Sequence, residues 1–224
     1  MQSDFGRYID HTLLQPTATT ADIRRLCAEA MEYGMAAVCI FPSYVALARE
    51  ILRNSRVNIA AVIAFPFGMT LTDIKESEMR SAASLGAGEM DIVINIGAVK
   101  SGDFETVESE MHRLVGRSRA LGVATKFIIE TATLTQDEKI AVCKIANRAR
   151  PDYMKTSTGY GPAGATVEDV RLMRTHLNPE IQIKAAGGIR SYREAREMLR
   201  AGASRLGSSS GIRIIQEAER TKEK

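Results

Sequence analysis

Short segments of strand length alternate along the chain with longer segments in which apolar residues recur every three or four positions. The apolar runs at 35–40 and 57–65 are typical of buried strands, whereas Ile23, Leu26 and Ala30 mark one face of an amphipathic helix. The same alternation continues along the chain. It predicts eight strands, each followed by a helix, at residues 8–14, 35–40, 57–65, 89–95, 124–131, 152–155, 181–184 and 205–207.

Start and stop signals support the helices between these strands. Thr135 with Glu138, and Ser191 with Glu194, have the spacing of a capping box, in which each side chain bonds a backbone N–H of the other residue. Thr166 is expected to cap a further helix. A glycine ends four of the predicted helices, at Gly34, Gly86, Gly122 and Gly202.

The predicted strands are almost entirely apolar, so both faces of their sheet need cover. That requirement is typical of a parallel sheet flanked by helices. Eight strand–helix units in 224 residues match a (β/α)8 barrel. We therefore predict an α/β protein with a single TIM-barrel domain over residues 1–224. An open doubly wound sheet is the alternative, but it more often has five or six strands.

Composition and charge narrow the classes of partner. The 30 basic and 27 acidic residues are spread along the chain and give a net charge of +3, without the basic block that nucleic-acid binding favours. The apolar runs are far shorter than the ~20 residues that span a bilayer, and the N-terminus lacks a signal-peptide pattern. Three separated cysteines, Cys27, Cys39 and Cys143, indicate buried thiols in a reducing cytoplasm. The three histidines have no metal-ligand spacing, so no metal is predicted.

Candidate chemistry lies where the strands end, because active sites of such barrels form at the carboxyl ends of the strands. Neighbouring residues of a strand point to opposite faces, and this alternation directs Asp91 and Lys184 into the barrel. Lys155 ends another strand and is followed by small polar residues. A lysine held there can act as a nucleophile that forms a Schiff base, although a solvated loop lysine is the alternative. The polar residues at predicted strand ends are Asp10, Asp91, Asn95, Glu130, Lys155 and Lys184.

The two lysines are expected to be neighbours, because strands six and seven should lie ~4.8 Å apart. A nearby cation together with burial lowers the pKa of one of two such amines. A structural ion pair between Lys184 and Asp91, without chemistry, is the alternative. Lys126 and Glu130 share a face of the fifth strand and are expected to pair with each other. Lys126 is a weak catalytic candidate because it stands at the start of its strand.

Glycine-rich turns follow the last two strands. Gly187 and Gly188 come after strand seven, and 207–211 reads Gly-Ser-Ser-Ser-Gly directly before a helix. Loops at these two places form the usual phosphate site of a TIM barrel, where converging backbone N–H groups bind an anion. Residues 159–164 match G-x-G-x-x-G, but the acidic residue that a dinucleotide site needs at the next strand end is missing. We interpret that segment as a phosphate-facing loop.

Taken together, these motifs resemble the deoxyribose-phosphate aldolases. The Lys-Thr-Ser-Thr-Gly and Lys-x-x-Gly-Gly pair is the most specific part of the resemblance, which runs from residue 9 to about residue 211. The matching segments are 9–14, 38–42, 89–95, 126–131, 155–159 and 184–190.

The resemblance implies a class I aldolase that needs no cofactor and acts in deoxyribose phosphate catabolism. Such an enzyme interconverts 2-deoxyribose 5-phosphate with acetaldehyde and glyceraldehyde 3-phosphate. It implies that Lys155 forms the Schiff base, that Lys184 is the second lysine, and that Asp91 is the acid–base partner. Some relatives end in a tyrosine that reaches over the site, whereas this chain has no tyrosine after Tyr192.

The remaining expectations concern the pocket and the partners. We expect a small phosphosugar substrate and a homo-oligomer, either a dimer or a tetramer. Another phosphosugar barrel, such as an isomerase or a different Schiff-base aldolase, and a non-catalytic sugar-phosphate binder remain alternatives. The residues expected to bind substrate or phosphate are Thr156, Ser157, Gly159, Gly187, Gly188, Gly207, Ser208 and Ser209. Those expected to line the pocket are Asp10, Thr12, Cys39 and Asn95.

Overall fold

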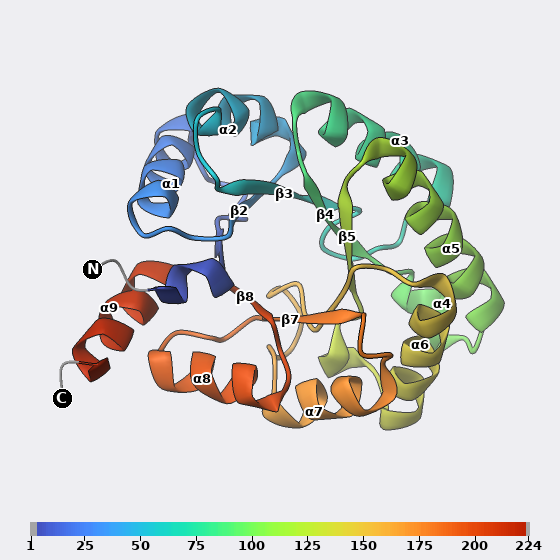
Figure 1. The fold of residues 1–224 in the computed structure, drawn as a ribbon. Helices are drawn as coiled ribbons and strands as arrows, with labels where there is room; N and C mark the ends of the chain where they lie inside the picture. The colour runs from blue at the N-terminus through green and yellow to red at the C-terminus, as the bar shows by residue number, and fades with distance from the viewer. Residues whose placement is uncertain (1–3, 223–224) are drawn as a thin grey trace.

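Eight parallel strands close into a barrel in a computed structural model of the chain, which describes residues 4–222 (Figure 1). Each strand pairs with its neighbour in sequence, and β8 also pairs with β1. This closure confirms the predicted TIM barrel and excludes the open sheet. The strands are β1 (Ile9–Thr12), β2 (Ala37–Ile40), β3 (Asn58–Ile63), β4 (Glu89–Val93), β5 (Ala124–Ile128), β6 (Tyr153–Lys155), β7 (Gln182–Ala186) and β8 (Arg205–Ser208).

A ring of helices surrounds the strands (Figure 1). The α-helices are α1 (Thr20–Glu32), α2 (Val45–Leu52), α3 (Thr72–Leu85), α4 (Ile96–Lys100), α5 (Phe104–Leu121), α6 (Gln136–Ala149), α7 (Val167–His176), α8 (Tyr192–Ala201) and α9 (Gly211–Lys222). Short 3₁₀ turns are η1 (Asp4–Tyr8), η2 (Pro42–Tyr44) and η3 (Thr131–Thr133). The short helix α4 was not predicted, and β4 and β5 end earlier than the apolar pattern indicated.

Local capping follows the sequence signals closely. Both predicted capping boxes, at the starts of α6 and α8, are present, and the Thr166 hydroxyl accepts a hydrogen bond from the backbone N–H of Asp169. Gly86, Gly122 and Gly202 are left-handed C-caps, a conformation that glycine adopts without steric cost. These caps fix where each helix ends and so where the next strand enters the barrel.

Two apolar clusters of different size pack against the two faces of the sheet. The larger lies between strands and helices and includes Met90, Ile92 and Ile183. The smaller consists of Leu14, Ala37, Cys39, Ala60 and Val62, with Phe41 and Phe65 packed against it. Its side chains are mostly small, which leaves room inside the barrel for charged groups. Asp10, Asp91, Lys126 and Lys184 fill that room and are fully buried.

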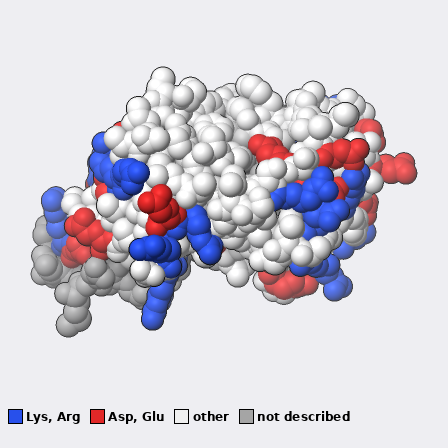
Figure 2. Space-filling view, turned by 90° about the horizontal axis from the view of Figure 1, so that it is seen from above, with Lys and Arg blue, Asp and Glu red and all other residues white. Residues whose placement is uncertain are grey.

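The outer surface carries one concentration of exposed apolar side chains. Phe67, Met69 and Leu71 lie in the turn from β3 into α3, and Ile74 lies in the first turn of α3. These four residues expose between 54% and 74% of their surface. Seen from the side of α2 and α3, the molecule has a broad uncharged area with charged residues toward its left and right (Figure 2). No helix within residues 4–222 has the length and apolar character needed to cross a membrane.

Candidate active site

Three lysine side chains converge on one buried carboxylate at the centre of the barrel. Lys155 Nζ and Lys184 Nζ each lie 2.7 Å from Asp91 Oδ2, and Lys126 Nζ lies 3.0 Å from Asp91 Oδ1. The register of the sheet explains this meeting, because Lys155 stands opposite Lys184 and Asp91 stands opposite Lys126. The structure therefore brings together the two lysines and the aspartate that alternation directed inward.

The charges continue into a closed ring of alternating sign. Lys184 Nζ lies 2.5 Å from Asp10 Oδ2, and Asp10 Oδ1 accepts a hydrogen bond of 2.7 Å from Arg205 Nη1. Arg205 then pairs with Glu89 at 3.3 Å, and Glu89 pairs with Lys126, which returns to Asp91. Every charge in this ring has an opposite charge on either side, which is the condition for burying ionised groups.

The ring keeps Asp91, Asp10 and Lys184 ionised. Burial raises the pKa of Asp91, but Lys126, Lys155 and Lys184 outweigh it and hold that pKa well below its usual value. Asp10 behaves similarly: its burial is outweighed by Lys184, Lys126 and Arg205, which lower its pKa to about 2. Burial lowers the pKa of Lys184, yet Asp10 and Asp91 raise it well above the ordinary value. These two carboxylates therefore hold Lys184 as an ammonium.

Lys155 differs from the other charged groups because it reaches the cavity above them. Without it, the cluster has three carboxyl groups, on Asp10, Glu89 and Asp91, and three cationic groups, on Lys126, Lys184 and Arg205. These charges already balance. Of this cluster, Lys155 alone belongs to the set of residues that line the cavity. The buried charges therefore balance without Lys155, which lines the space where a substrate carbonyl can enter.

The predicted pair between Lys126 and Glu130 is wrong. Lys126 points to Asp91 and Glu89, whereas Glu130 Oε2 accepts hydrogen bonds from Thr158. β5 ends at Ile128, so Glu130 has left the strand and no longer follows its alternation. Lys126, a weak candidate because it stands at the start of the predicted strand, is a direct partner of the central carboxylate. β5 runs from Ala124 to Ile128, so Lys126 stands at the middle of the strand, and the register sets it opposite Asp91.

A cavity of about 290 Å³ opens at the carboxyl ends of β1, β6, β7 and β8. Of the predicted residues, Thr12, Lys155, Gly159, Gly187, Gly188, Gly207, Ser208 and Ser209 line it. Leu14, Gln15, Thr158, Tyr160 and Arg190 also line it and were missed. The Ser208 hydroxyl donates to the carbonyl oxygen of Ile189 at 2.7 Å and accepts from the N–H of Ser210, so it shapes the loop. Ser209 is exposed to the cavity and is the freer of the two hydroxyls.

The remaining predicted residues lie outside the cavity lining. Thr156 exchanges hydrogen bonds with the backbone of Ala186 and ties β6 to β7, and Ser157 beside it is fully buried. Asp10 and Cys39 lie among the buried groups around Asp91, with Cys39 Sγ 3.6 Å from Asp91 Oδ2. Burial raises the pKa of the Cys39 thiol to about 11.

Asn95 does not line the pocket as predicted. β4 ends at Val93, so Asn95 stands beyond the strand, and its side-chain oxygen accepts the N–H of Ala98 as the N-cap of α4. Its role in the structure is therefore to start a helix.

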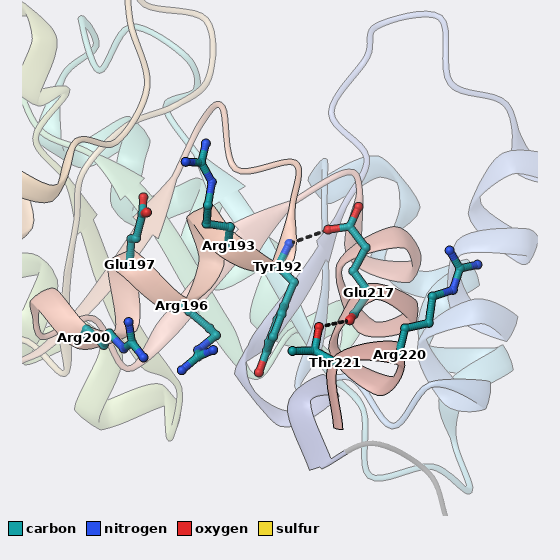
Figure 3. Close-up of a pocket in the computed structure, with 8 residues that line it drawn as sticks. All are labelled: Tyr192, Arg193, Arg196, Glu197, Arg200, Glu217, Arg220 and Thr221. Atoms are coloured by element: carbon teal, nitrogen blue, oxygen red, sulfur yellow. Dashed lines mark hydrogen bonds between the residues drawn. The ribbon is translucent and has the colours of Figure 1, made fainter. Parts of the chain in front are cut away.

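A larger hollow of about 880 Å³ lies outside the barrel between α8 and α9 (Figure 3). Its lining includes Arg193, Arg196, Arg200 and Arg220, whose guanidinium groups point in different directions (Figure 3). A binding site needs polar groups that converge on one place. The cavity above Lys155 meets that condition and the outer hollow does not, so the candidate active site is the cavity.

Fold and site together define a barrel enzyme with a cavity-facing lysine above a buried carboxylate. The sequence matches the model of the DeoC/LacD family aldolases over residues 7–217. The chain belongs to this aldolase family.

Matches to individual proteins are more specific than the match to the family. The chain is 51% identical to the deoxyribose-phosphate aldolase of Thermococcus gammatolerans, over 96% of both chains. It is 50% identical to the enzyme of the same name from Thermococcus kodakarensis, over 96% of this chain and 97% of the relative. Among solved structures, the tetrameric deoxyribose phosphate aldolase of Aeropyrum pernix superposes with a TM-score of 0.90 at 30% identity, covering 96% of this chain and 91% of that one.

The charge ring predicts a specific dependence of stability on pH. The pKa of Asp10 lies at about 2 in the folded protein, below its ordinary value of 3.8. A lowered carboxyl pKa stabilises the fold above the ordinary pKa, and this stabilisation is lost as the pH falls toward 2. In urea unfolding at pH 4 to 2, the unfolding free energy of the wild type should lose about 2 kcal/mol more than that of Asp10→Asn.

Asp137→Asn, at an exposed position on α6, is the matched control and should keep the wild-type pH dependence. If Asp10→Asn loses stability with pH as steeply as the wild type, the low pKa assigned to Asp10 is wrong.

Proposed function

We propose that this chain is a class I deoxyribose-phosphate aldolase that reversibly cleaves 2-deoxyribose 5-phosphate into acetaldehyde and glyceraldehyde 3-phosphate. One observation carries the proposal: Lys155 lines the cavity while its Nζ contacts Asp91, and Lys184 contacts the same carboxylate oxygen. The two Thermococcus relatives, both named deoxyribose-phosphate aldolase, support the choice of substrate. In this proposal residues 1–224 form one catalytic domain.

The first step is formation of a covalent imine. The neutral amine of Lys155 attacks C1 of the open-chain sugar to form a carbinolamine. Its hydroxyl takes a proton from solvent water and leaves as water, which gives an iminium ion. The positive charge now on the lysine nitrogen lies beside the carboxylate of Asp91, 2.7 Å away in the free enzyme. A fixed negative charge at that place stabilises the iminium without having to reorganise.

The second step breaks the C2–C3 bond. A water that is hydrogen-bonded to Asp91 and Lys184 takes the proton of the C3 hydroxyl, and the bonding electrons move into the iminium to form an enamine. Glyceraldehyde 3-phosphate leaves with its new aldehyde at the former C3. The raised pKa of Lys184 keeps it an ammonium, so it can supply hydrogen bonds to this water throughout. Protonation of the enamine at C2 through the same water, followed by hydrolysis, releases acetaldehyde and restores Lys155.

The far end of the substrate binds at the glycine-rich loops. Gly187, Gly188 and Gly207 line the cavity together with Ser209, and α9 begins at Gly211 directly beyond them. Backbone N–H groups at a helix N-terminus and in glycine turns bind phosphate well. Anchoring the phosphate there brings C1 toward Lys155, so that the reacting atoms meet in a fixed orientation.

Covalent trapping tests the role of Lys155. Borohydride added together with acetaldehyde should reduce the imine, inactivate the enzyme and leave the adduct on Lys155 in a peptide map. Lys184→Leu should lower kcat by at least about 100-fold, the usual contribution of a proton-transfer group. Lys144→Leu, at an exposed position on α6, is the control and should keep wild-type kcat. An adduct on Lys184, or none on any lysine, would contradict the assignment.

Charge at the phosphate site gives a second test. Ser209→Asp should place a carboxylate beside the substrate phosphate and raise KM for 2-deoxyribose 5-phosphate by about tenfold or more, because like charges repel in a partly buried site. Activity on unphosphorylated 2-deoxyribose should fall much less. Ser209→Ala removes the hydroxyl without adding charge and serves as the control. Equal losses on both substrates would place the phosphate elsewhere.

We also propose that the chain acts as a homo-oligomer in the cytoplasm. The Aeropyrum pernix relative is a tetramer, and Phe67, Met69, Leu71 and Ile74 give this chain an exposed apolar cluster of the kind that marks protein interfaces. A second copy of this chain is the occupant that the relative favours. The buried free thiols of Cys27, Cys39 and Cys143 are consistent with a reducing compartment.

Leu71→Asp tests this interface. Leu71 is the N-cap residue of α3, and aspartate is a favourable N-cap, so the variant should fold. In size-exclusion chromatography with light scattering, the wild type should be a dimer or tetramer, and Leu71→Asp should shift toward the monomer. Met31→Asp, at an exposed apolar position on α1, is the control. A monomeric wild type, or an unchanged mass for Leu71→Asp, would exclude this surface.

A further inference from the structure

Glu130 occupies an unusual position directly beyond β5. Its backbone is left-handed, with φ of 50° and ψ of 64°, although it is not a glycine. Its side chain is nevertheless buried, with only 3% of the residue exposed. Backbone of this kind persists where the surroundings hold it in place, and it is concentrated at functional sites. Here the surroundings are the segment that follows Lys155, since Thr131 N–H donates to Thr156 O at 2.9 Å.

The carboxylate of Glu130 holds this segment through Thr158. Glu130 Oε2 accepts the backbone N–H of Thr158 at 3.1 Å and also the Thr158 hydroxyl. The Thr158 hydroxyl oxygen in turn accepts the N–H of Tyr160 at 3.0 Å. Two hydrogen bonds from Thr158 to the buried carboxylate and one from Tyr160 to Thr158 therefore connect Glu130 to the backbone that carries Tyr160. Thr158, Gly159 and Tyr160 all line the cavity, whereas Glu130 does not.

Tyr160 reaches from this segment to the opposite side of the cavity. Its hydroxyl donates to the carbonyl oxygen of Leu14 at 2.5 Å, and Leu14 follows β1 and also lines the cavity. The ring packs edge-on against Phe65, with centroids 5.5 Å apart and planes at 89°. Tyr160 thus links the segments after β1 and β6 across the cavity. We refer to the linked residues Glu130, Thr158, Tyr160 and Leu14 as the strap.

Close packing at Gly161 fixes the Glu130 side chain from the other side. A Cβ atom at residue 161 would lie 2.8 Å from the carboxylate carbon and from Oε1 of Glu130. No other side chain fits there unless the carboxylate moves. Glu130 Oε1 itself is buried and has no hydrogen-bond partner within residues 4–222. The carboxylate therefore keeps its place through Thr158 on one side and through contact with Gly161 on the other.

We propose that Glu130 is a positioning residue that acts through Thr158 to hold Tyr160 across the cavity against Leu14. This inference rests on the proposed aldolase function. The strap fixes the wall next to Lys155, so that bound substrate meets a formed cavity. Its loss leaves Lys155, Asp91 and Lys184 in place but weakens the hold on the substrate. The expected signature is therefore a rise in KM with a smaller change in kcat.

Two variants break the strap at its two ends. Glu130→Gly removes the carboxylate and suits the left-handed backbone, so folding is not the obstacle. Tyr160→Phe removes only the hydroxyl that donates to Leu14. Each should raise KM for 2-deoxyribose 5-phosphate about fivefold or more, the effect of one lost hydrogen bond. Glu130→Gln keeps an acceptor oxygen for Thr158 and should restore most of the loss.

Matched controls separate the strap from general destabilisation. Arg150→Gly makes the same backbone change at another left-handed residue, which caps α6 away from the cavity. Tyr44→Phe removes a hydroxyl that donates to the carbonyl oxygen of Ala18, also at 2.5 Å. Neither residue lines the cavity, and both variants should keep wild-type KM.

The double variant and hydrogen exchange decide the outcome. If both residues act through one strap, Glu130→Gly with Tyr160→Phe should raise KM no further than the stronger single variant. Amide exchange at Thr158 should be at least about tenfold faster in Glu130→Gly than in Arg150→Gly. Additive effects on KM, or unchanged exchange at Thr158, would overturn the proposal. Absence of cleavage by the wild type would instead refute the proposed function, and the exchange experiment would still test the strap.

Discussion

The carboxylate of Asp91 is the group on which the arrangement of the site depends. It is fully buried and contacts Lys126, Lys155 and Lys184, which come from three consecutive strands. An isolated buried charge is very costly, so the four side chains are stable only when the strands hold their register. Closure of the barrel and catalysis therefore depend on the same contacts. The small residues of the inner apolar cluster leave the space that these contacts need.

The charge ring divides the cations by function. Lys126, Lys184 and Arg205 are balanced by Asp10, Glu89 and Asp91 below the cavity, and they act as fixed charges. Lys155 extends the ring to the cavity, and the buried charges balance without it. Electrostatic stabilisation by fixed charges needs no reorganisation during the reaction, which is the main advantage of placing them in a rigid barrel.

Sequence patterns predicted the barrel, the inward direction of Asp91 and Lys184, and the glycine loops, because alternation and turn chemistry are local properties. They failed for residues that lie just beyond a strand end. They also failed for a residue whose contacts depend on its position along the barrel axis. Glu130 and Asn95 were placed by continuing strands that in fact end at Ile128 and Val93. Lys126 was underrated because the register between β4 and β5, which sets it opposite Asp91, is a long-range property.

The strap shows why residues outside the strands still matter for a site built on strands. The sheet fixes Lys155, and Thr156 is hydrogen-bonded to β7, but the strands do not fix residues 157–161. Those residues carry Thr158 and Tyr160, and their hydrogen bonds run to Glu130 beyond β5 and to Leu14 beyond β1. The cavity is therefore assembled from rigid strand ends below and from tied loops above. A change in the loops alters how substrate is held, while a change in the strands alters the charges that perform the reaction.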